Sequence, residues 1–312
     1  MRTYIKHILV GLSGFLLTSN LAFSQQEPQY TQYMFNTVSV NPAYAGTTNA
    51  LNFVALSRMQ WVGLKGAPVT HTFSMHTPIN GKKAGVGLSV ISDKIGPVNN
   101  FYLSASYSYR VPLNEKVTLS LGLKGGIYNY YVGLNRLSII ENNDVAFNQN
   151  ETKKFHPNLG LGAYFYADRW YAGLAIPTLI QSDLNKDNVN TNKVSELKRH
   201  YFLMAGYVFP INSDWDFKPS FIEKVVTGSP LSTDLTAQFL YRKAYWMGAT
   251  YRIGDALAFL FEAQVSEQIT IGYSYDITTS KLAGHNRGSH EILLSYSFEK
   301  LTAKKIKSPR YF

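Results

Sequence analysis

The sequence predicts a closed antiparallel β-barrel that spans a membrane, and three observations lead to this fold. Apolar and polar residues alternate along most of the chain, the alternating runs are mostly nine to eleven residues long, and tight turns alternate with longer connections. A period of two places one set of side chains on each face of a strand. Globular strands average about five or six residues, whereas a tilted membrane-spanning strand needs about nine to eleven. Run length therefore favours a membrane barrel over a soluble β-sandwich.

Composition agrees with a surface that meets lipid. Of the 312 residues, 45% are hydrophobic and only 16% are charged, against about 25% charged in a typical soluble domain. The apolar content excludes a disordered chain, and the lack of cysteine excludes a disulfide scaffold and a cysteine zinc site. The net charge of +10 raises nucleic acid as a partner, but the basic residues are scattered rather than gathered on one face, so we expect no nucleic acid binding.

The first residues indicate export. Arg2 and Lys6 precede an apolar stretch over 8–17, and Ala22-Phe23-Ser24 offers small residues for a signal peptidase. We therefore expect residues 1–24 to be a signal peptide that is cut after Ser24, with an uncleaved anchor as the alternative. An exported chain without long apolar helices is periplasmic, secreted or an outer-membrane barrel, and the alternation selects the barrel.

Fourteen runs carry the alternation, and together they predict a barrel body over residues 51–298. The predicted strands lie near 51–59, 69–77, 83–91, 101–110, 117–127, 157–166, 169–177, 199–209, 214–222, 231–241, 244–252, 256–265, 267–277 and 288–298. An open sheet edge has no hydrogen-bond partner in hydrocarbon, so a sheet of this kind must close on itself. The predicted fold class is an all-β, antiparallel outer-membrane β-barrel of about 14 strands.

The turns assign the two ends of this barrel. A Pro-aliphatic-Asn motif recurs at 78–80, 112–114 and 210–212, where proline presets the turn and asparagine tolerates the left-handed conformation. The longest connections, 128–154 and 178–198, fall on the opposite end. Short periplasmic turns and long external loops are the rule for outer-membrane barrels, and an even strand count returns both chain ends to the periplasmic side. Four tryptophans near predicted strand ends suggest an interfacial aromatic girdle: Trp61, Trp170, Trp215 and Trp246.

Polar and charged residues on the second face of the strands should point into the lumen. A lumen of about fourteen strands is too wide for wall side chains alone to fill, so either another segment occupies it or it conducts. The candidate lumen charges are Arg110, Lys124, Lys218, Arg252, Asp216, Asp234, Glu262 and Glu291. Two interpretations stay open for them: internal ion pairs that rigidify the wall or hold a plug, and a polar track for a solute or chain.

The segment 25–50 precedes the first strand and is too apolar to extend into water uncovered. It would cap the periplasmic mouth, enter the lumen as an insert, or pack against the barrel base as an ordered lead-in. Two motifs stand out in it, Gln29-Tyr30-Thr31-Gln32-Tyr33-Met34-Phe35-Asn36 and Asn41-Pro42-Ala43-Tyr44-Ala45-Gly46. Candidate binding residues in these motifs are Tyr30, Gln32, Tyr33, Phe35, Asn41, Pro42 and Gly46.

This pair of motifs resembles the start of the PorP/SprF-like outer-membrane proteins of the type IX secretion system. Gly288-Ser289-His290-Glu291-Ile292 and the terminal Pro309-Arg310-Tyr311-Phe312 resemble that family too. The resemblance implies an outer-membrane protein of Bacteroidota-type bacteria that works in protein secretion and, in some members, gliding motility. It also implies three kinds of partner: outer-membrane lipid, the C-terminal sorting domain of secreted cargo, and periplasmic and outer-membrane secretion components.

No motif indicates catalysis, a cofactor or a metal site. His71 and His76 differ in parity and face opposite sides of one strand, and no H-E-x-x-H or Gly-rich phosphate loop occurs. We therefore expect a non-enzymatic accessory that assists export or surface attachment of cargo, with an outer-membrane pore for small solutes as the alternative. Residues 299–312 would form a basic periplasmic tail that either docks on an acidic partner or is simply solvated.

Overall fold

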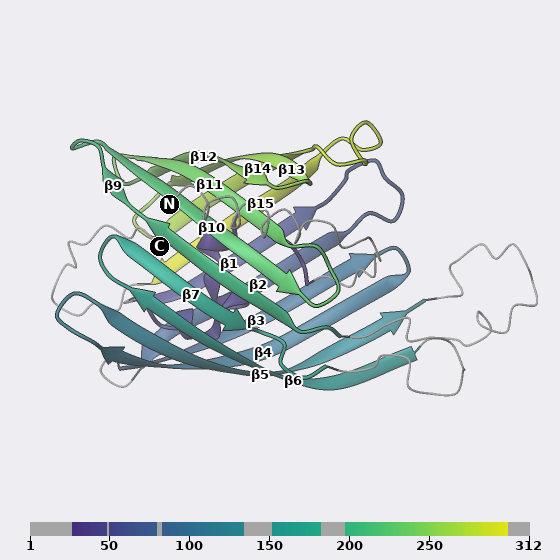
Figure 1. Ribbon diagram of the computed structural model, residues 1–312, viewed down its shortest axis with the longest axis horizontal. Helices are drawn as coiled ribbons and strands as arrows, with labels where there is room; N and C mark the ends of the chain where they lie inside the picture. Colours follow the sequence, from purple (N-terminus) through teal and green to yellow (C-terminus); the bar gives the residue numbers. More distant parts are fainter. Residues whose placement is uncertain (1–26, 49, 80–82, 134–151, 182–196, 299–312) are drawn as a thin grey trace, which may run out of the picture.

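The computed structural model describes residues 27–48, 50–79, 83–133, 152–181 and 197–298, and its strands close into one barrel (Figure 1). Within these residues a single sheet holds fifteen strands, each antiparallel to its neighbours, and the first strand pairs with the last. The eighth and ninth strands both pair with the tenth, so they occupy one position and the wall has fourteen. The predicted all-β outer-membrane barrel is confirmed.

The strands include all fourteen predicted runs, one of which is divided into two strands. They are β1 (Leu51–Met59), β2 (Val69–Ile79), β3 (Ala84–Ile95), β4 (Val98–Pro112), β5 (Thr118–Val132), β6 (Thr152–Tyr166), β7 (Trp170–Ile176), β8 (His200–Tyr207), β9 (Phe209–Pro210), β10 (Trp215–Val226), β11 (Ser232–Tyr241), β12 (Tyr245–Arg252), β13 (Ala256–Gln264), β14 (Ile269–Thr278) and β15 (Ser289–Phe298). Three helical turns precede them: η1 (Tyr33–Phe35), α2 (Thr37–Val40) and η2 (Pro42–Tyr44).

Six strands are longer than predicted, and β4, β5 and β6 exceed their predicted runs the most. Each of these three has 15 residues. The added residues of β5 and β6 flank the long connection between these two strands, and those at the start of β4 pair with the end of β5. There the alternation weakens, as in Val98-Asn99-Asn100 and Tyr130-Tyr131-Val132, yet the ladder continues from Val98↔Val132 onward. Hydrogen bonding to the neighbouring strand therefore extends these strands beyond the residues whose side chains alternate.

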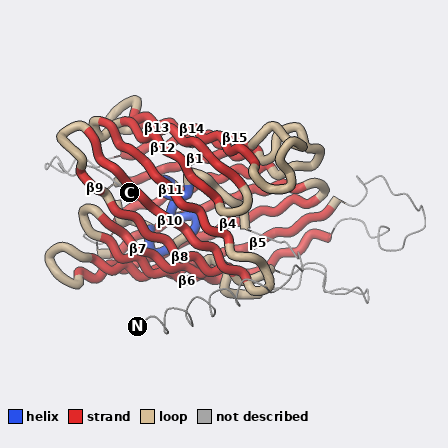
Figure 2. The backbone as a smooth tube through the Cα atoms, turned by 45° about the horizontal axis from the view of Figure 1, so that its top comes forward, coloured by secondary structure: helices blue, strands red, loops and turns tan. Residues whose placement is uncertain are grey.

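The two faces of the wall divide the side chains as the alternation predicts. Outward positions carry large, exposed apolar side chains, such as Phe73, Leu123 and Phe259. Inward positions carry small polar residues that are buried, such as Ser108 and Ser274. Small inward side chains leave room inside the barrel, and the helical turns occupy that room (Figure 2).

Asparagine side chains close two of the short turns. Asn114 Oδ1 accepts the backbone N–H groups of Lys116 and Val117, and Asn212 Oδ1 accepts those of Asp214 and Trp215. This explains the Pro-aliphatic-Asn motif at 112–114 and 210–212, while Asn80 of the third motif lies outside the described residues. We call the end of the barrel with these turns the periplasmic end, because short turns face the periplasm in outer-membrane barrels, and the opposite end the outer end.

One tryptophan departs from the expected girdle. Trp246 is 8% exposed and packs edge-on against Phe35 inside the barrel, with ring centroids 6.1 Å apart. Trp170 and Trp215 do begin strands. Trp246 was expected in the girdle because it lies near a strand end. Side chains alternate between the two faces of a strand, however, and Trp246 stands at a position that faces inward. Within the described residues, no helix has the length and hydropathy needed to cross a bilayer.

A charge placed on the outward face tests the lipid-facing assignment. Leu123 in β5 is 59% exposed and Leu113, in the turn before that strand, is 52% exposed. Leu123→Arg should lower the free energy of unfolding by about 2–4 kcal/mol, because an arginine near the bilayer midplane loses its hydration. The measurement is equilibrium unfolding from phospholipid vesicles. Leu113→Arg is the matched control and should cost about 0–1 kcal/mol; equal costs at the two sites would contradict the assignment.

Candidate functional site

The N-terminal segment runs through the lumen from one end of the barrel to the other. We call residues 27–46 the plug. At the outer end, the Thr178 hydroxyl donates to Glu27 Oε1 at 2.6 Å and the Glu27 backbone N–H donates to His200 Nε2 at 3.2 Å. At the periplasmic end, the Gly46 N–H donates to His76 Nδ1 at 3.1 Å and Ser108 Oγ donates to the Ala45 carbonyl at 2.6 Å. The sequence left open whether segment 25–50 is a cap, a lumen insert or a lead-in. The described residues of this segment lie in the lumen.

Short-range hydrogen bonds give the plug its compact form. Asn41 is the N-cap of η2: its Oδ1 accepts the Ala43 N–H at 3.0 Å, and Pro42 stands at the first helical position, where no N–H is needed. The Thr37 and Ser39 hydroxyls donate to carbonyls three or four residues earlier. Because these groups bond within the segment, the plug carries few unmet backbone groups into the lumen.

Asn41 also ties the plug to the wall. Its Nδ2 donates to the carbonyl oxygens of Ala163 in β6, at 3.1 Å, and Leu174 in β7, at 3.3 Å. These two residues face each other across the β6–β7 ladder. The side chain is fully buried, so its amide binds main-chain atoms of two strands in a water-poor setting, where such hydrogen bonds are strong.

Glycines on the inner face of the wall let the plug approach the sheet backbone. A Cβ at Gly122 would lie 2.2 Å from Ala43 N, one at Gly162 would lie 2.1 Å from Asn41 Oδ1, and one at Gly85 would lie 2.1 Å from the Ala45 carbonyl oxygen. These contacts are far below van der Waals distance, so any larger residue would displace the plug. These inward glycines therefore have a structural role: they leave space for the backbone of the plug.

A group of buried charges lies on the inner wall toward the outer end. We call Arg58, Asp234, Arg252, Asp276 and Glu291 the charge cluster. Arg58 Nη2 lies 2.7 Å from Asp276 Oδ2 and its Nη1 lies 3.1 Å from Glu291 Oε2. Arg252 holds Asp234 through two nitrogens at 3.0 Å each, and a third nitrogen lies 3.5 Å from Asp276. The cluster spans β1, β11, β12, β14 and β15, and its two arginines face three carboxylates, one of which also lies 3.7 Å from Lys224 Nζ in β10.

The charge cluster forms direct hydrogen bonds with the plug. Glu291 accepts the backbone N–H of Thr31 at 3.0 Å on one oxygen and that of Gln32 at 2.8 Å on the other. The Thr31 hydroxyl donates to Asp276 at 2.9 Å and accepts from Arg58 Nη1 at 3.1 Å. Glu291 therefore provides acceptors for two plug N–H groups that would otherwise be buried without partners.

Aromatic residues of the plug fill the space below and beside the cluster. The Tyr30 hydroxyl lies 2.8 Å from Thr72 Oγ1, and both Tyr30 and Tyr33 are almost fully buried. Burial raises the pKa of both phenols above the ordinary range, so each stays neutral. Phe35, with Trp246 and Tyr171, surrounds the fully buried Lys218 ammonium at 5.1–5.8 Å from the ring centroids, a cation–π arrangement.

The structure brings some predicted lumen charges together and separates others. Arg252 meets Asp234, and Glu291 contacts Arg58, which the sequence analysis had not named. Lys218 lies within electrostatic range of Glu262. Arg110 and Lys124, for which ion pairing was one of the two interpretations, donate to the backbone carbonyls of Ala84, at 2.7 Å, and Ser39, at 3.4 Å. Asp216 is buried as well.

The predicted segment residues all lie in the plug. Their places differ. Gln32 binds the charge cluster, and Tyr30, Tyr33 and Phe35 pack in the hydrophobic core of the lumen. Asn41, Pro42 and Gly46 lie in the periplasmic half of the plug. Sequence reasoning missed Arg58 and Asp276 as cluster members. Parity could have found them, since Arg58 continues the inward set of Val54 and Leu56, and Asp276 that of Ser274.

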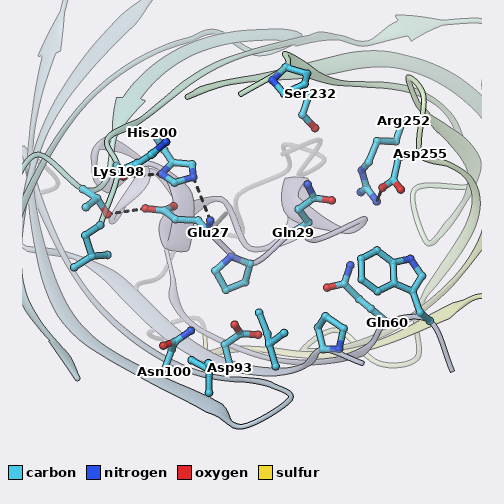
Figure 3. A pocket seen from close by; sticks show the side chains of 18 of the residues that line it. Glu27, Gln29, Gln60, Asp93, Asn100, Lys198, His200, Ser232, Arg252 and Asp255 are labelled. Carbon is cyan, nitrogen blue, oxygen red and sulfur yellow. Dashed lines mark hydrogen bonds and ion pairs between the residues drawn. The ribbon is translucent and has the colours of Figure 1, made fainter. Parts of the chain in front are cut away.

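The outer end of the lumen holds a cavity of ≈ 700 Å³, which we call the outer cavity (Figure 3). The plug residues Glu27 and Gln29 form part of its floor, and Asp93, Asn100 and Asp255 point into it from the wall. Within the described residues, no group of three His, Cys, Asp or Glu side chains is placed to hold a metal ion.

Comparison with known proteins relates the chain to one protein family and to several solved structures. A family model described as "Type IX secretion system membrane protein PorP/SprF" matches residues 22–296. No curated protein sequence matches the chain. Among solved structures, the chain is similar to a Pseudomonas aeruginosa FadL homologue (12% identity, TM-score 0.47, 89% of this chain and 96% of that chain). It is also similar to the CymD monoaromatic hydrocarbon channel (10%, 0.49, 90% and 95%) and the Ralstonia pickettii toluene transporter TbuX (9%, 0.47, 83% and 92%).

Removal of one member of the charge cluster should be costly. Arg58→Ala leaves Asp276 and Glu291 buried without their main counter-ion, so we expect a loss of about 3–5 kcal/mol in unfolding free energy. Arg242→Ala is the matched control, because Arg242 pairs with Asp214 at 3.4 Å while its side chain is 64% exposed, and exposed pairs contribute about 0–1 kcal/mol. Denaturant titration of both variants in micelles measures the difference; a loss at Arg58 no larger than at Arg242 would show that the cluster does not stabilise the barrel.

Proposed function

This chain belongs to the PorP/SprF family of type IX secretion system membrane proteins, and we propose that it acts there as a non-catalytic adaptor. In this role it assists the export or surface attachment of cargo proteins that carry a C-terminal sorting domain, and it does so as a closed barrel in the outer membrane. Gliding motility is one process that such an adaptor would serve.

The observation that carries this proposal is the filled lumen. The plug contacts the wall in the outer half of the barrel through Glu27, Thr31 and Gln32, and at the periplasmic end through Ala45 and Gly46. A barrel whose lumen is occupied along its height by its own buried chain offers its two ends as binding surfaces rather than a route for transport. Such a geometry supports an adaptor more than a pore.

Partners would meet the adaptor at its two ends. The outer end carries the longest connections and the outer cavity, and is the side on which an exported cargo domain arrives. The periplasmic end carries the short turns and the point at which the chain leaves the barrel at Phe298, the side of the periplasmic secretion components. The basic tail 299–312, which would extend this second surface, lies outside the described residues.

The alternative of a pore for small solutes makes an opposite electrical prediction. The intact protein should show no steady conductance in planar bilayers, because the plug fills the lumen. Gly122→Val should create conductance, since its side chain would overlap the backbone of Ala43. Gly125→Val is the matched control on the same strand: a Cβ there meets no atom within 4 Å, and the residue faces outward, so that variant should stay closed. Steady conductance of the unmodified protein would favour the pore.

Co-purification tests the adaptor role itself. A tagged chain expressed at its native level and extracted in mild detergent should retain a cargo protein with a C-terminal sorting domain or a component of the secretion machinery. An unrelated outer-membrane barrel from the same membranes is the control. Deletion of the gene should in addition reduce the surface amount of the cargo by several-fold. Recovery of the barrel alone, together with normal cargo display in the deletion strain, would contradict the proposal.

A further inference from the structure

Backbone hydrogen bonds join three connections at the outer end of the barrel. The Val62 N–H, between β1 and β2, donates to the Gly288 carbonyl at 2.8 Å, and the Val62 carbonyl accepts the Arg287 N–H at 2.8 Å. The same connection meets the turn between β3 and β4, where the Gly96 N–H donates to the Gly66 carbonyl at 2.9 Å. Side chains on these connections are therefore carried by one continuous, hydrogen-bonded backbone.

This part of the outer end carries exposed cations without exposed carboxylates. Lys65, Lys94 and Arg287 are exposed, and within the described residues none of them forms an ion pair. The structure describes all of residues 57–71, 92–100 and 273–292. The carboxylates in these ranges are buried on the lumen face: Asp93, Asp276 and Glu291. The outer surface over β14, β15, β1, β2 and β3 is therefore positively charged.

The three cations gather around the connection between β1 and β2. A Cβ at Gly63 would lie 3.8 Å from Arg287 Cγ, so the arginine side chain lies against the connection that carries Lys65. Lys94 pairs with Val69, the first residue of β2 after this connection. Residues from three separate parts of the chain thus place their positive charges at one point of the barrel edge.

Two imidazole rings extend this positive surface along the outward face of the wall. His71 of β2 lies 3.0 Å through its Nδ1 from Ser57 Oγ, and His290 of β15 lies 2.7 Å through its Nδ1 from the Tyr273 hydroxyl. Within the described residues, neither Nε2 forms a hydrogen bond. Both rings are thus oriented by the wall and keep one nitrogen for a group outside it. We call Lys65, Lys94, Arg287, His71 and His290 the basic rim.

The basic rim stands where the lipid-facing wall reaches its outer limit. The next outward residues toward the barrel middle are apolar and exposed, Phe73 below His71 and Ile292 below His290. Exposed apolar side chains also lie among the cations: Met59, Leu64 and Ile95. Connections that meet only water seldom gather such side chains. The mixture of cations and apolar groups suits an anionic amphiphile better than an acidic protein in water.

We propose that the basic rim binds the phosphate groups of lipid A, the phosphorylated glycolipid of the outer leaflet of the outer membrane. Lys65, Lys94 and Arg287 bind phosphate oxygens through charge-assisted hydrogen bonds, and the two imidazole Nε2 atoms supply further polar contacts. The acyl chains lie on the outward face of β15, β1 and β2, beside Phe73 and Ile292. This site uses neither the lumen nor the plug, so it goes beyond the adaptor role and holds a surface lipid at the side of the barrel.

Lipid binding by the purified barrel tests this site. The probes are lipid A and chemically dephosphorylated lipid A in nonionic detergent, and native mass spectrometry counts the bound molecules. The unmodified protein should prefer the phosphorylated lipid at least about five-fold. Lys65→Ala/Lys94→Ala/Arg287→Ala should weaken lipid A binding at least about ten-fold and remove the preference, because each lysine or arginine at an anionic membrane surface contributes about a five-fold factor.

A matched triple variant separates a specific site from general charge. Lys116→Ala/Arg169→Ala/Lys243→Ala removes the same residue types from exposed periplasmic turns and should leave lipid A binding unchanged. Lys65→Arg/Lys94→Arg/Arg287→Lys keeps the charge and should retain binding. Migration as a folded barrel on unheated gels checks that each variant is assembled. Equal binding of both lipids by the unmodified protein, or an equal loss in the two alanine variants, would overturn the proposal.

Discussion

A closed wall with fourteen strand positions encloses more volume than its own side chains fill, and the organisation of this molecule depends on that constraint. The space is taken by a segment that brings peptide groups of its own, each of which needs a partner. Glu291, bound by Arg58, supplies acceptors for two of them at once. Wall glycines then allow the backbone of the segment to reach the sheet, so charge, hydrogen bonding and shape all serve one filled interior.

The sequence predicts the wall far better than what lies inside it. Strand positions follow from a period of two, which is a local property, and β1 was expected at its observed bounds. The largest exceptions, β4 to β6, gain residues through pairing with a neighbour, which no single strand encodes. Trp246 was misplaced because its distance from a strand end was weighed above its parity. The strand extensions thus reflect contacts between distant residues, whereas the error at Trp246 reflects neglect of a local pattern that was correct.

The interior charges illustrate the same limit. Parity identifies that Arg110, Lys218 and Glu291 face the lumen, but it cannot say which charges meet, because their strands are distant along the chain. Arg58 and Asp276 both contact Thr31 of the plug, yet each stands alone in a run of uncharged residues. Only the closure of β1 on β15, beside β14, brings the two next to Glu291. Their joint role is a product of topology rather than of motif.

Asn41 links the position of the plug to the register of two wall strands. Its amide binds main-chain carbonyl groups of Ala163 and Leu174, two residues that face each other across β6 and β7. A slip of one residue between strands moves every side chain to the opposite face, so a misaligned wall would set a different pair of residues opposite Asn41. The contacts that hold the plug in the lumen therefore depend on the register of the wall around it.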